Sequence, residues 1–277
     1  MSPATHDEVK KIVSFLNSRN LSFLAFGSTS NLLFSDQGLR AVAICIGPRM
    51  SGVEVDGDCF HVKGGTWVPS LARSVARAGY SGFEHVCGIP GTVGGLVMMN
   101  GGSLRRSASE YLVEILSVTA TGETRITAKE DCGFGYRRSH FQDSGQIITG
   151  VTFRFEHRDL YSQIRRRMLT ILSDRRAKFP QRMPNCGSVF KAHDEMYAQI
   201  GPPGAVLDKL GFKGRRIGGA QVSLEHANFI NNVGGACASD VRRLAHEMKE
   251  AVFAETGYLI EPEACFVESC GRVRPLI

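Results

Sequence analysis

Several short signatures that mark common enzyme folds are missing from this sequence. No G-x-G-x-x-G follows a predicted strand, and neither a Walker loop nor a Gly-x-Ser-x-Gly elbow is present. Such motifs place backbone N–H groups around phosphates or expose a nucleophilic serine. Their absence argues against a Rossmann dinucleotide site, a P-loop nucleotidase and an α/β-hydrolase.

Metal-binding and export patterns are also missing. The eight cysteines form no C-x-x-C pair and no Cys/His pair at zinc-finger spacing, so we expect reduced thiols and no bound metal. The amino terminus, MSPATHDEVKK, has no apolar stretch of the kind found in secretory signals, which predicts a cytoplasmic protein. An uncharged run at 87–102 is broken by a proline, an asparagine and six glycines, so it does not predict a membrane-spanning helix.

The composition is that of a folded protein with room for two domains. The chain has 277 residues, of which 43% are hydrophobic and 22% charged, and its formal net charge is +6. A positive charge permits an anionic partner. The arginine clusters at 165–167, 175–176 and 215–216 lack interleaved aromatic residues, so they favour a solvated face or a small phosphorylated substrate over nucleic acid.

The hydrophobic pattern predicts an α+β protein without repeats. Apolar residues at helical spacing predict helices at 6–19, 67–78, 160–178, 205–210 and 239–256. Short apolar runs bounded by turn residues predict strands or hairpins at 21–26, 42–46, 52–63, 112–127, 146–155 and around 269–271. We expect the helix at 160–178 to link the two domains.

The most distinctive segment is Cys87 to Gly102, CGIPGTVGGLVMMNGG. Glycines remove Cβ atoms where a ligand could touch the main chain, and Pro90 stiffens the turn before Gly91. The same composition suits a tight crossover between packed layers. Glycine content alone leaves both interpretations open.

A second small-residue loop, Gly27 to Asn31, follows the strand predicted at 21–26. Its successive N–H groups could form an anion-binding nest, although such runs are also ordinary turns. Isolated polar residues mark the second half of the chain: Ser188, Lys191, Gln221, His226, Asn228 and Glu263. This division predicts a cofactor half built from backbone and a substrate half built from side chains, although each polar residue singly also has an ordinary structural interpretation.

Seven segments, in order along the chain, resemble one family. They are GSTSNLLFSDQGLR, GFEHVCGIPGTVGG, MNGG, FGYRRSHF, NCGSVFK, LGFKGRRIGGAQVSLEHANFINN and LIEPEACFV. Together they are similar to the UDP-N-acetylenolpyruvoylglucosamine reductase (MurB) family from about Val9 to the C-terminus. The spacing from Arg137 to Ser188 resembles the shorter form of the family, which lacks an extra substrate-covering insertion.

The resemblance implies a fold, a reaction and two cofactors. The fold would be α+β, with a vanillyl-alcohol-oxidase-like (PCMH-type) FAD-binding domain of two lobes over residues 1–158 and a MurB-type substrate domain over residues 159–277. NADPH would reduce FAD, and flavin N5 would pass hydride to C3 of the enolpyruvyl ether, giving UDP-N-acetylmuramate. This NADP-dependent oxidoreductase would serve peptidoglycan synthesis, and with it cell wall biogenesis, cell shape and cell division. It would be a monomer that binds a sugar nucleotide and neither nucleic acid nor membrane.

The resemblance also assigns roles to residues. Ser188 would protonate C2, while Arg137 and Glu263 would flank the enolpyruvyl group and steady the enolate-like intermediate. Hydride addition builds negative charge on C2 and the carboxylate, which a guanidinium stabilises. FAD would contact Gly27, Ser28, Thr29, Ser30, Asn31, Gly88, Ile89, Pro90, Gly91, Thr92, Gly94, Gly95 and Ser139. The substrate would contact Tyr136, Lys191, Gln221, His226 and Asn228.

The sequence departs from the family pattern at four places. The family's N-terminal segment, a Thr-containing strand with a Gly-Gly turn, is expected to be truncated. Thr29 stands where glycine is usual, and its β-branched side chain restricts φ and ψ beside the pyrophosphate. Ala192-His193 replaces Asn-Pro, and the segment from Asn100 to Arg105 differs from Asn-Ala-Gly-Ala-Tyr-Gly.

These departures keep other functions open. A diverged, non-catalytic homologue could bind a sugar nucleotide or a partner without holding FAD, which the late start and Thr29 would favour. A flavin reductase for a different enolpyruvyl or nucleotide-linked substrate would account for Ala192 and His193. A nucleic-acid-binding role is the most distant alternative.

Overall fold

The computed structural model describes every residue from Met1 to Ile277. The chain forms two compact units, the first made of Met1–Ser28 and Val42–Arg175 and the second of Thr29–Ala41 and Arg176–Ile277. Both mix helices and strands, which confirms the α+β class. The chain therefore visits the second unit early, over residues 29–41, whereas a single boundary at 158/159 would place that segment with the first.

The first unit begins with a small lobe. Helix α1 (His6–Ser18) leads to β1 (Phe23–Phe26), which pairs in parallel with β3 (Val42–Cys45). The apolar stripe predicted for the helix is buried in a cluster that includes side chains of this strand pair together with Val118 and Ile147, as expected for an amphipathic helix. The buried side chains of this lobe include Val9, Val13, Leu16, Ile44 and Ile46.

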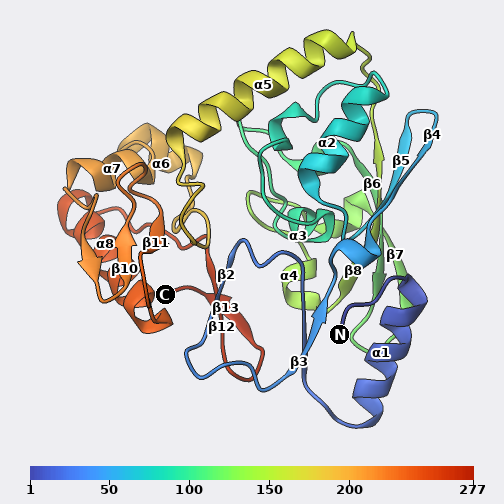
Figure 1. Cartoon of the computed structure of the whole chain (residues 1–277), viewed down its shortest axis with the longest axis horizontal. Helices are drawn as coiled ribbons and strands as arrows, with labels where there is room; N and C mark the ends of the chain where they lie inside the picture. Colours follow the sequence, from blue (N-terminus) through green and yellow to red (C-terminus); the bar gives the residue numbers. More distant parts are fainter. The chain divides into compact units, whose positions relative to one another are not determined.

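The larger lobe of the first unit is a five-stranded antiparallel sheet in the order β4-β5-β8-β6-β7. Its strands are β4 (Val53–Asp56), β5 (Cys59–Lys63), β6 (Leu112–Val118), β7 (Thr124–Ala128) and β8 (Ile147–Arg154). Its helices are α2 (Val68–Arg77), α3 (Val93–Met98), α4 (Phe141–Ser144) and α5 (Tyr161–Lys178). Both hairpins predicted from the sequence, at 52–63 and 112–127, are present (Figure 1).

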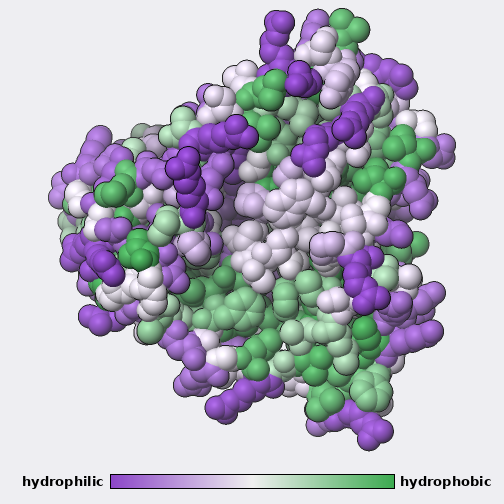
Figure 2. Space-filling view, viewed as in Figure 1, coloured by the Kyte–Doolittle hydropathy of each residue, from purple (hydrophilic) through white to green (hydrophobic).

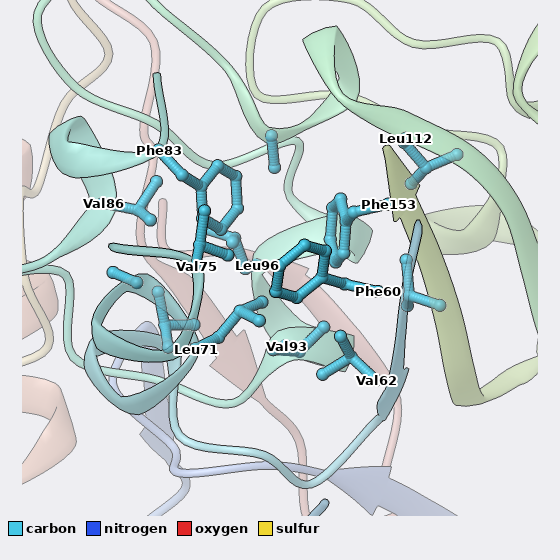
Figure 3. Close-up of a cluster of buried hydrophobic side chains, with 14 of the residues drawn as sticks. Phe60, Val62, Leu71, Val75, Phe83, Val86, Val93, Leu96, Leu112 and Phe153 are labelled. Carbon is cyan, nitrogen blue, oxygen red and sulfur yellow. The ribbon is translucent and has the colours of Figure 1, made fainter. Parts of the chain in front are cut away.

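One hydrophobic core holds α2 and α3 against the sheet. Figure 3 shows side chains from β5, β6 and β8 facing side chains from the two helices. The labelled members are Phe60, Val62, Leu71, Val75, Phe83, Val86, Val93, Leu96, Leu112 and Phe153. Because α3 lies within the glycine-rich segment, this core fixes the position of that segment.

The glycine-rich segment is thus partly helical, which the sequence did not predict. Thr92 caps α3, and its Oγ1 accepts a hydrogen bond from the N–H of Gly95 (3.4 Å). Two glycines in six residues weaken helix propensity by about 1 kcal/mol each. Burial of Val93, Leu96 and Val97 outweighs that cost.

The second unit contains two small sheets. Strand β2 (Leu32–Phe34) pairs in parallel with β12 (Cys265–Val267), which pairs with β13 (Val273–Pro275). The other sheet is antiparallel and comprises β9 (Arg216–Ile217), β10 (Ala220–Val222) and β11 (Ile230–Asn232). The helices are α6 (Asp194–Gln199), α7 (Pro203–Lys209) and α8 (Ala238–Thr256). The sequence predicted α7 and α8 and missed α6.

The early segment 29–41 is fastened into the second unit at more than one point. Besides the β2–β12 pairing, the Asp36 carboxylate accepts hydrogen bonds from the N–H groups of Ala238 (2.6 Å) and Ser239 (3.1 Å) at the start of α8. These two bonds hold the pKa of Asp36 below its ordinary value.

The surface of α5 is strongly basic. Only Ile164 and Met168 of this helix are buried, and hydrophilic side chains follow its course in Figure 2. None of the helices combines the length and the apolar character that crossing a membrane requires.

Candidate functional site

In the first unit, the end of β1 meets the start of α3. A Cβ atom on Gly27 would lie 2.1 Å from Oγ1 of Thr92, so the backbone can approach this closely only at glycine. Gly91, just before Thr92, has a φ of +152°, which L-residues rarely adopt. The two loops singled out in the sequence therefore touch each other here.

The glycines of the 88–95 segment have two different uses. A Cβ on Gly88 would lie 2.5 Å from Cδ of Arg175, and one on Gly94 would lie 3.3 Å from the carbonyl oxygens of Gly64 and Ile148. These two glycines allow close packing. Gly95, in contrast, is exposed, and its Cβ would meet only Thr92 Oγ1 at 3.5 Å. The crossover and ligand interpretations each apply to part of the segment.

Backbone donors in the first unit are available to a ligand. Thr92 is buried, and its N–H donates no hydrogen bond within the protein. The N–H groups of Ser28 and Gly91 likewise have no internal acceptor. A buried N–H without an acceptor is rare in native structures, so an oxygen-rich ligand such as a dinucleotide cofactor fits this loop pair.

Thr29 takes a conformation that usually belongs to glycine. Its φ is +56°, in the left-handed region, and its side chain is exposed. For a β-branched residue this conformation costs about 1–3 kcal/mol. The restriction expected from the sequence therefore shows up as backbone strain in the folded chain.

Arg137 lies on a tight turn of the first unit. Gly135 and Arg138 exchange backbone hydrogen bonds of 3.0 and 3.2 Å, and Arg137 has a φ of +55°. Its Nη2 donates to the carbonyl of Gly102 (3.2 Å), and its Cζ lies 5.0 Å from the ring centroid of Tyr136. The structure thus places Tyr136 beside Arg137.

Ser139, expected to contact the cofactor, is buried next to this turn. Its Oγ donates to the carbonyl of Met98 at the end of α3 (2.6 Å). The hydroxyl proton is therefore used within the protein, where it ties the segment after the turn to α3.

Ser188 and Glu263 lie on neighbouring backbone segments of the second unit. Phe190 and Pro262 form an antiparallel bridge, and the N–H of Glu263 donates to the carbonyl of Val189 (2.8 Å). Ser188 is half-buried, and its hydroxyl makes no hydrogen bond within the protein. The second unit thus brings together two of the three residues expected to be catalytic and leaves the hydroxyl available.

Two asparagine amides hold these segments. Asn228 is buried; its Nδ2 donates to the carbonyl of Phe190 (2.9 Å) and its Oδ1 accepts from the N–H of Phe190 (3.0 Å). Asn31 Nδ2 donates to the carbonyl of Glu263 (3.1 Å). The Asn228 amide therefore fixes the backbone two residues after Ser188, and the Asn31 amide fixes the backbone at Glu263 itself.

Lys191 is paired with a carboxylate that the sequence analysis did not select. Its Nζ lies 3.1 Å from Oε2 of Glu261, and Nε2 of His193 lies 3.5 Å from the same oxygen. The hydrogen bond from Lys191 lowers the pKa of Glu261. No local signal could have selected Glu261, because Lys191 lies 70 positions earlier in the chain and only the folded backbone brings the two together.

Gln221 and His226 make internal contacts elsewhere in the second unit. Gln221 Nε2 donates to the carbonyl of Gly214 (3.0 Å). The His226 ring lies 5.2 Å from the ring of Phe179, and its Nδ1 accepts from the N–H of Asn228 (3.2 Å). Burial lowers the pKa of His226, consistent with a neutral ring that accepts this bond.

Comparison with known proteins accounts for both halves of the chain. Residues 1–128 match an FAD binding domain, and residues 179–267 match the C-terminal domain of UDP-N-acetylenolpyruvoylglucosamine reductase. UDP-N-acetylenolpyruvoylglucosamine reductase 1 of Corynebacterium glutamicum is 35% identical over 273 residues, which cover 99% of this chain and 81% of that protein. The chain belongs to the UDP-N-acetylenolpyruvoylglucosamine reductase (MurB) family.

Other members of the MurB family agree in sequence and in structure. The reductase of Prochlorococcus marinus is 34% identical over 97% of this chain and 90% of its own length. The crystal structure of MurB from Thermus caldophilus superposes with a TM-score of 0.78 at 32% identity, covering 96% of this chain and 90% of that one. The predicted fold, an FAD-binding domain followed by a MurB-type C-terminal domain, is confirmed.

Proposed function

We propose that this protein is an FAD-dependent, NADPH-using reductase that converts UDP-N-acetylglucosamine enolpyruvate to UDP-N-acetylmuramate for peptidoglycan synthesis. The observation that carries the proposal is the similarity, over 99% of the chain, to a reductase named for this substrate. The substrate is a sugar nucleotide, and the net charge of +6 favours binding of its phosphates.

We assign the proton that completes the reduction to Ser188. Its hydroxyl is half-buried and makes no hydrogen bond within the protein, so it can donate to C2 of the bound substrate. Glu263 follows Pro262, which forms an isolated bridge with Phe190, and we assign its carboxylate to the same step. The backbone contacts of the second unit support this pairing.

We assign charge stabilisation to Arg137. A guanidinium is always protonated and presents several donors in one plane, so it suits the carboxylate of an enolpyruvyl group. As negative charge develops on that carboxylate and on C2, a fixed cation lowers the barrier. The turn and the Gly102 carbonyl hold Arg137 for this role.

We assign cofactor binding to the first unit. The free N–H groups of Ser28, Gly91 and Thr92 would bind phosphate oxygens, and the open side of Gly95 would lie along the flavin. Bound FAD supplies the hydride, which it takes from NADPH. We place the substrate with Ser188, Lys191 and Glu263 in the second unit.

Two measurements test this function. The purified protein should be yellow, and it should oxidise NADPH rapidly only when UDP-N-acetylglucosamine enolpyruvate is present. UDP-N-acetylglucosamine, which lacks the enolpyruvyl group, is the matched control and should not support turnover. A colourless protein without affinity for FAD would instead favour a non-catalytic homologue.

A further inference from the structure

The turn that carries Arg137 is fastened by a residue outside it. Asn100 is buried, and its Nδ2 donates to the carbonyl of Gly135 (2.9 Å), the residue that opens the turn. Its Oδ1 accepts from the N–H of Ser109 (3.2 Å). Both the nitrogen and the oxygen of the Asn100 amide are therefore hydrogen-bonded. The carbonyl of Gly135 accepts one bond from Asn100 Nδ2 and one from the N–H of Arg138.

The backbone of Asn100 connects this contact to α3. Its N–H donates to the carbonyl of Val97 within α3 (3.0 Å), and its φ is +41°. Asparagine tolerates the left-handed region better than most residues, so this position can carry an amide where many side chains would be strained. Asn100, which holds the Arg137 turn, thus lies two residues after the end of α3 and is hydrogen-bonded to it.

The guanidinium itself is held by the same segment. Arg137 Nη2 donates to the carbonyl of Gly102, two residues after Asn100 (3.2 Å), while Gln142 Nε2 donates to the carbonyl of Arg137 (3.1 Å). A shift of residues 100–102 would therefore move both the backbone and the charged end of Arg137.

We propose that Asn100 is a positioning residue for Arg137: its amide fixes the turn at residues 135–138, so that the guanidinium meets the enolpyruvyl carboxylate in the orientation that reduction needs. This inference rests on the proposed function. It gives a role to Asn100, which keeps the usual residue at the start of a segment that otherwise departs from the family pattern.

The test uses Asn100→Gly in the FAD-loaded protein. Glycine keeps the left-handed conformation at little cost and removes only the amide. Asn20→Gly is the matched control, because Asn20 is another asparagine of the first unit with a positive φ (+52°), and it is exposed. Rapid mixing measures flavin reduction by NADPH and, separately, oxidation of the reduced flavin by the enolpyruvyl substrate.

We expect Asn100→Gly to slow the substrate step by about 10- to 100-fold, since a misplaced group can cost that much. Flavin reduction should change by less than about twofold. If Asn100 acts only through Arg137, then Asn100→Gly combined with Arg137→Ala should be no slower than Arg137→Ala alone. Multiplying effects, or equal slowing of both steps, would overturn the inference.

A second readout does not depend on activity. Trypsin cleaves after arginine, so a loosened turn should be cut faster between Arg137 and Arg138 in Asn100→Gly than in the wild type or Asn20→Gly. An unchanged cleavage rate would contradict the role of Asn100. If the wild-type protein fails to reduce the substrate, the proposed function is wrong, and the trypsin result still decides whether Asn100 holds the turn.

Discussion

Arg137 and Ser188 are held in different ways. The Ser188 segment is fixed by backbone bonds, Val189 N–H to the Asn228 carbonyl (2.9 Å) and Lys191 N–H to the Glu261 carbonyl (2.9 Å), with the Asn228 amide in addition. The bonds that fasten the Arg137 turn to the rest of the first unit include several from side chains, those of Asn100, Arg137 and Ser139.

This difference sets what a substitution can do. Backbone pairing survives a change of side chain, so the Ser188 segment should keep its shape in most variants and show chemical effects directly. The Arg137 turn is fastened through side-chain hydrogen bonds, so variants there should misplace a group without unfolding the protein.

Ser188→Ala removes the proposed proton donor from a segment whose backbone should keep its shape. Of the changes considered, it should have the largest effect. Removal of a general acid typically costs about 10²- to 10⁴-fold, so turnover should fall by that factor. Flavin reduction by NADPH should be unchanged, as rapid-mixing absorbance will show. Full turnover in this variant would remove Ser188 from the proton-donor role.

Acid should lower the stability of the first unit through His85, which contacts the segment from Asn100 to Arg105 through Ser103. This residue is buried, Ser103 Oγ donates to its carbonyl, and burial lowers the pKa of its ring to about 4, with Arg106, Glu84 and Glu110 nearby. Because the unfolded chain binds the proton first, stability is full above the ordinary pKa of 6.5 and is lost as pH falls towards 4.

The expected loss between these pH values is about 3 kcal/mol. Urea unfolding followed by circular dichroism across this range measures it. The leucine of His85→Leu cannot take up a proton. Between the same two pH values, this variant should therefore lose about 3 kcal/mol less stability than the wild type. Parallel pH profiles for the two proteins would show that His85 is not responsible.

Asn228→Ala measures how much the amide adds to the backbone-held segment. The change leaves the N–H and carbonyl of Phe190 without their amide partners, which should lower the free energy of unfolding by about 2 kcal/mol. Asn231→Ala is the matched control, because Asn231 is also buried but its Oδ1 has no hydrogen-bond partner. Equal losses in both variants would mean that burial, and not the bonds to Phe190, matters.

Thr29→Gly should have the smallest effect and the opposite sign. Relief of the left-handed strain, reduced by the larger entropy of glycine in the unfolded chain, should stabilise the protein by about 1 kcal/mol. Thermal or urea unfolding measures the gain, and Asn20→Gly should gain less because asparagine tolerates this conformation. No gain in Thr29→Gly would mean that the threonine is not strained.

Much of the fold follows from local patterns in the sequence. Helices such as α1 and α8, and the hairpin turning at Gly57, have clear periodicity and turn residues, and they form as predicted. Helix α3 was missed because tertiary burial outweighs the low propensity of Gly94 and Gly95. The pairing of β2 with β12 joins residues more than 200 positions apart, and no local signal indicates it.

The site was predictable where it rests on motifs and obscure where it rests on supporting contacts. The sequence placed Ser188 and Glu263 in the substrate half, and the structure puts them on adjacent backbone. It gave no indication that Asn100 holds the Arg137 turn or that Glu261 pairs with Lys191. Such partners lie far apart in the chain, and only the folded geometry brings them together.

The central claim is that this protein reduces an enolpyruvyl sugar nucleotide with electrons from NADPH. The most direct test mixes the protein, reduced anaerobically with NADPH, with UDP-N-acetylglucosamine enolpyruvate. The account predicts that the yellow colour of oxidised flavin returns as UDP-N-acetylmuramate forms, about one molecule per protein. Reduced flavin that the substrate leaves unchanged, or a protein that binds no flavin, would contradict it.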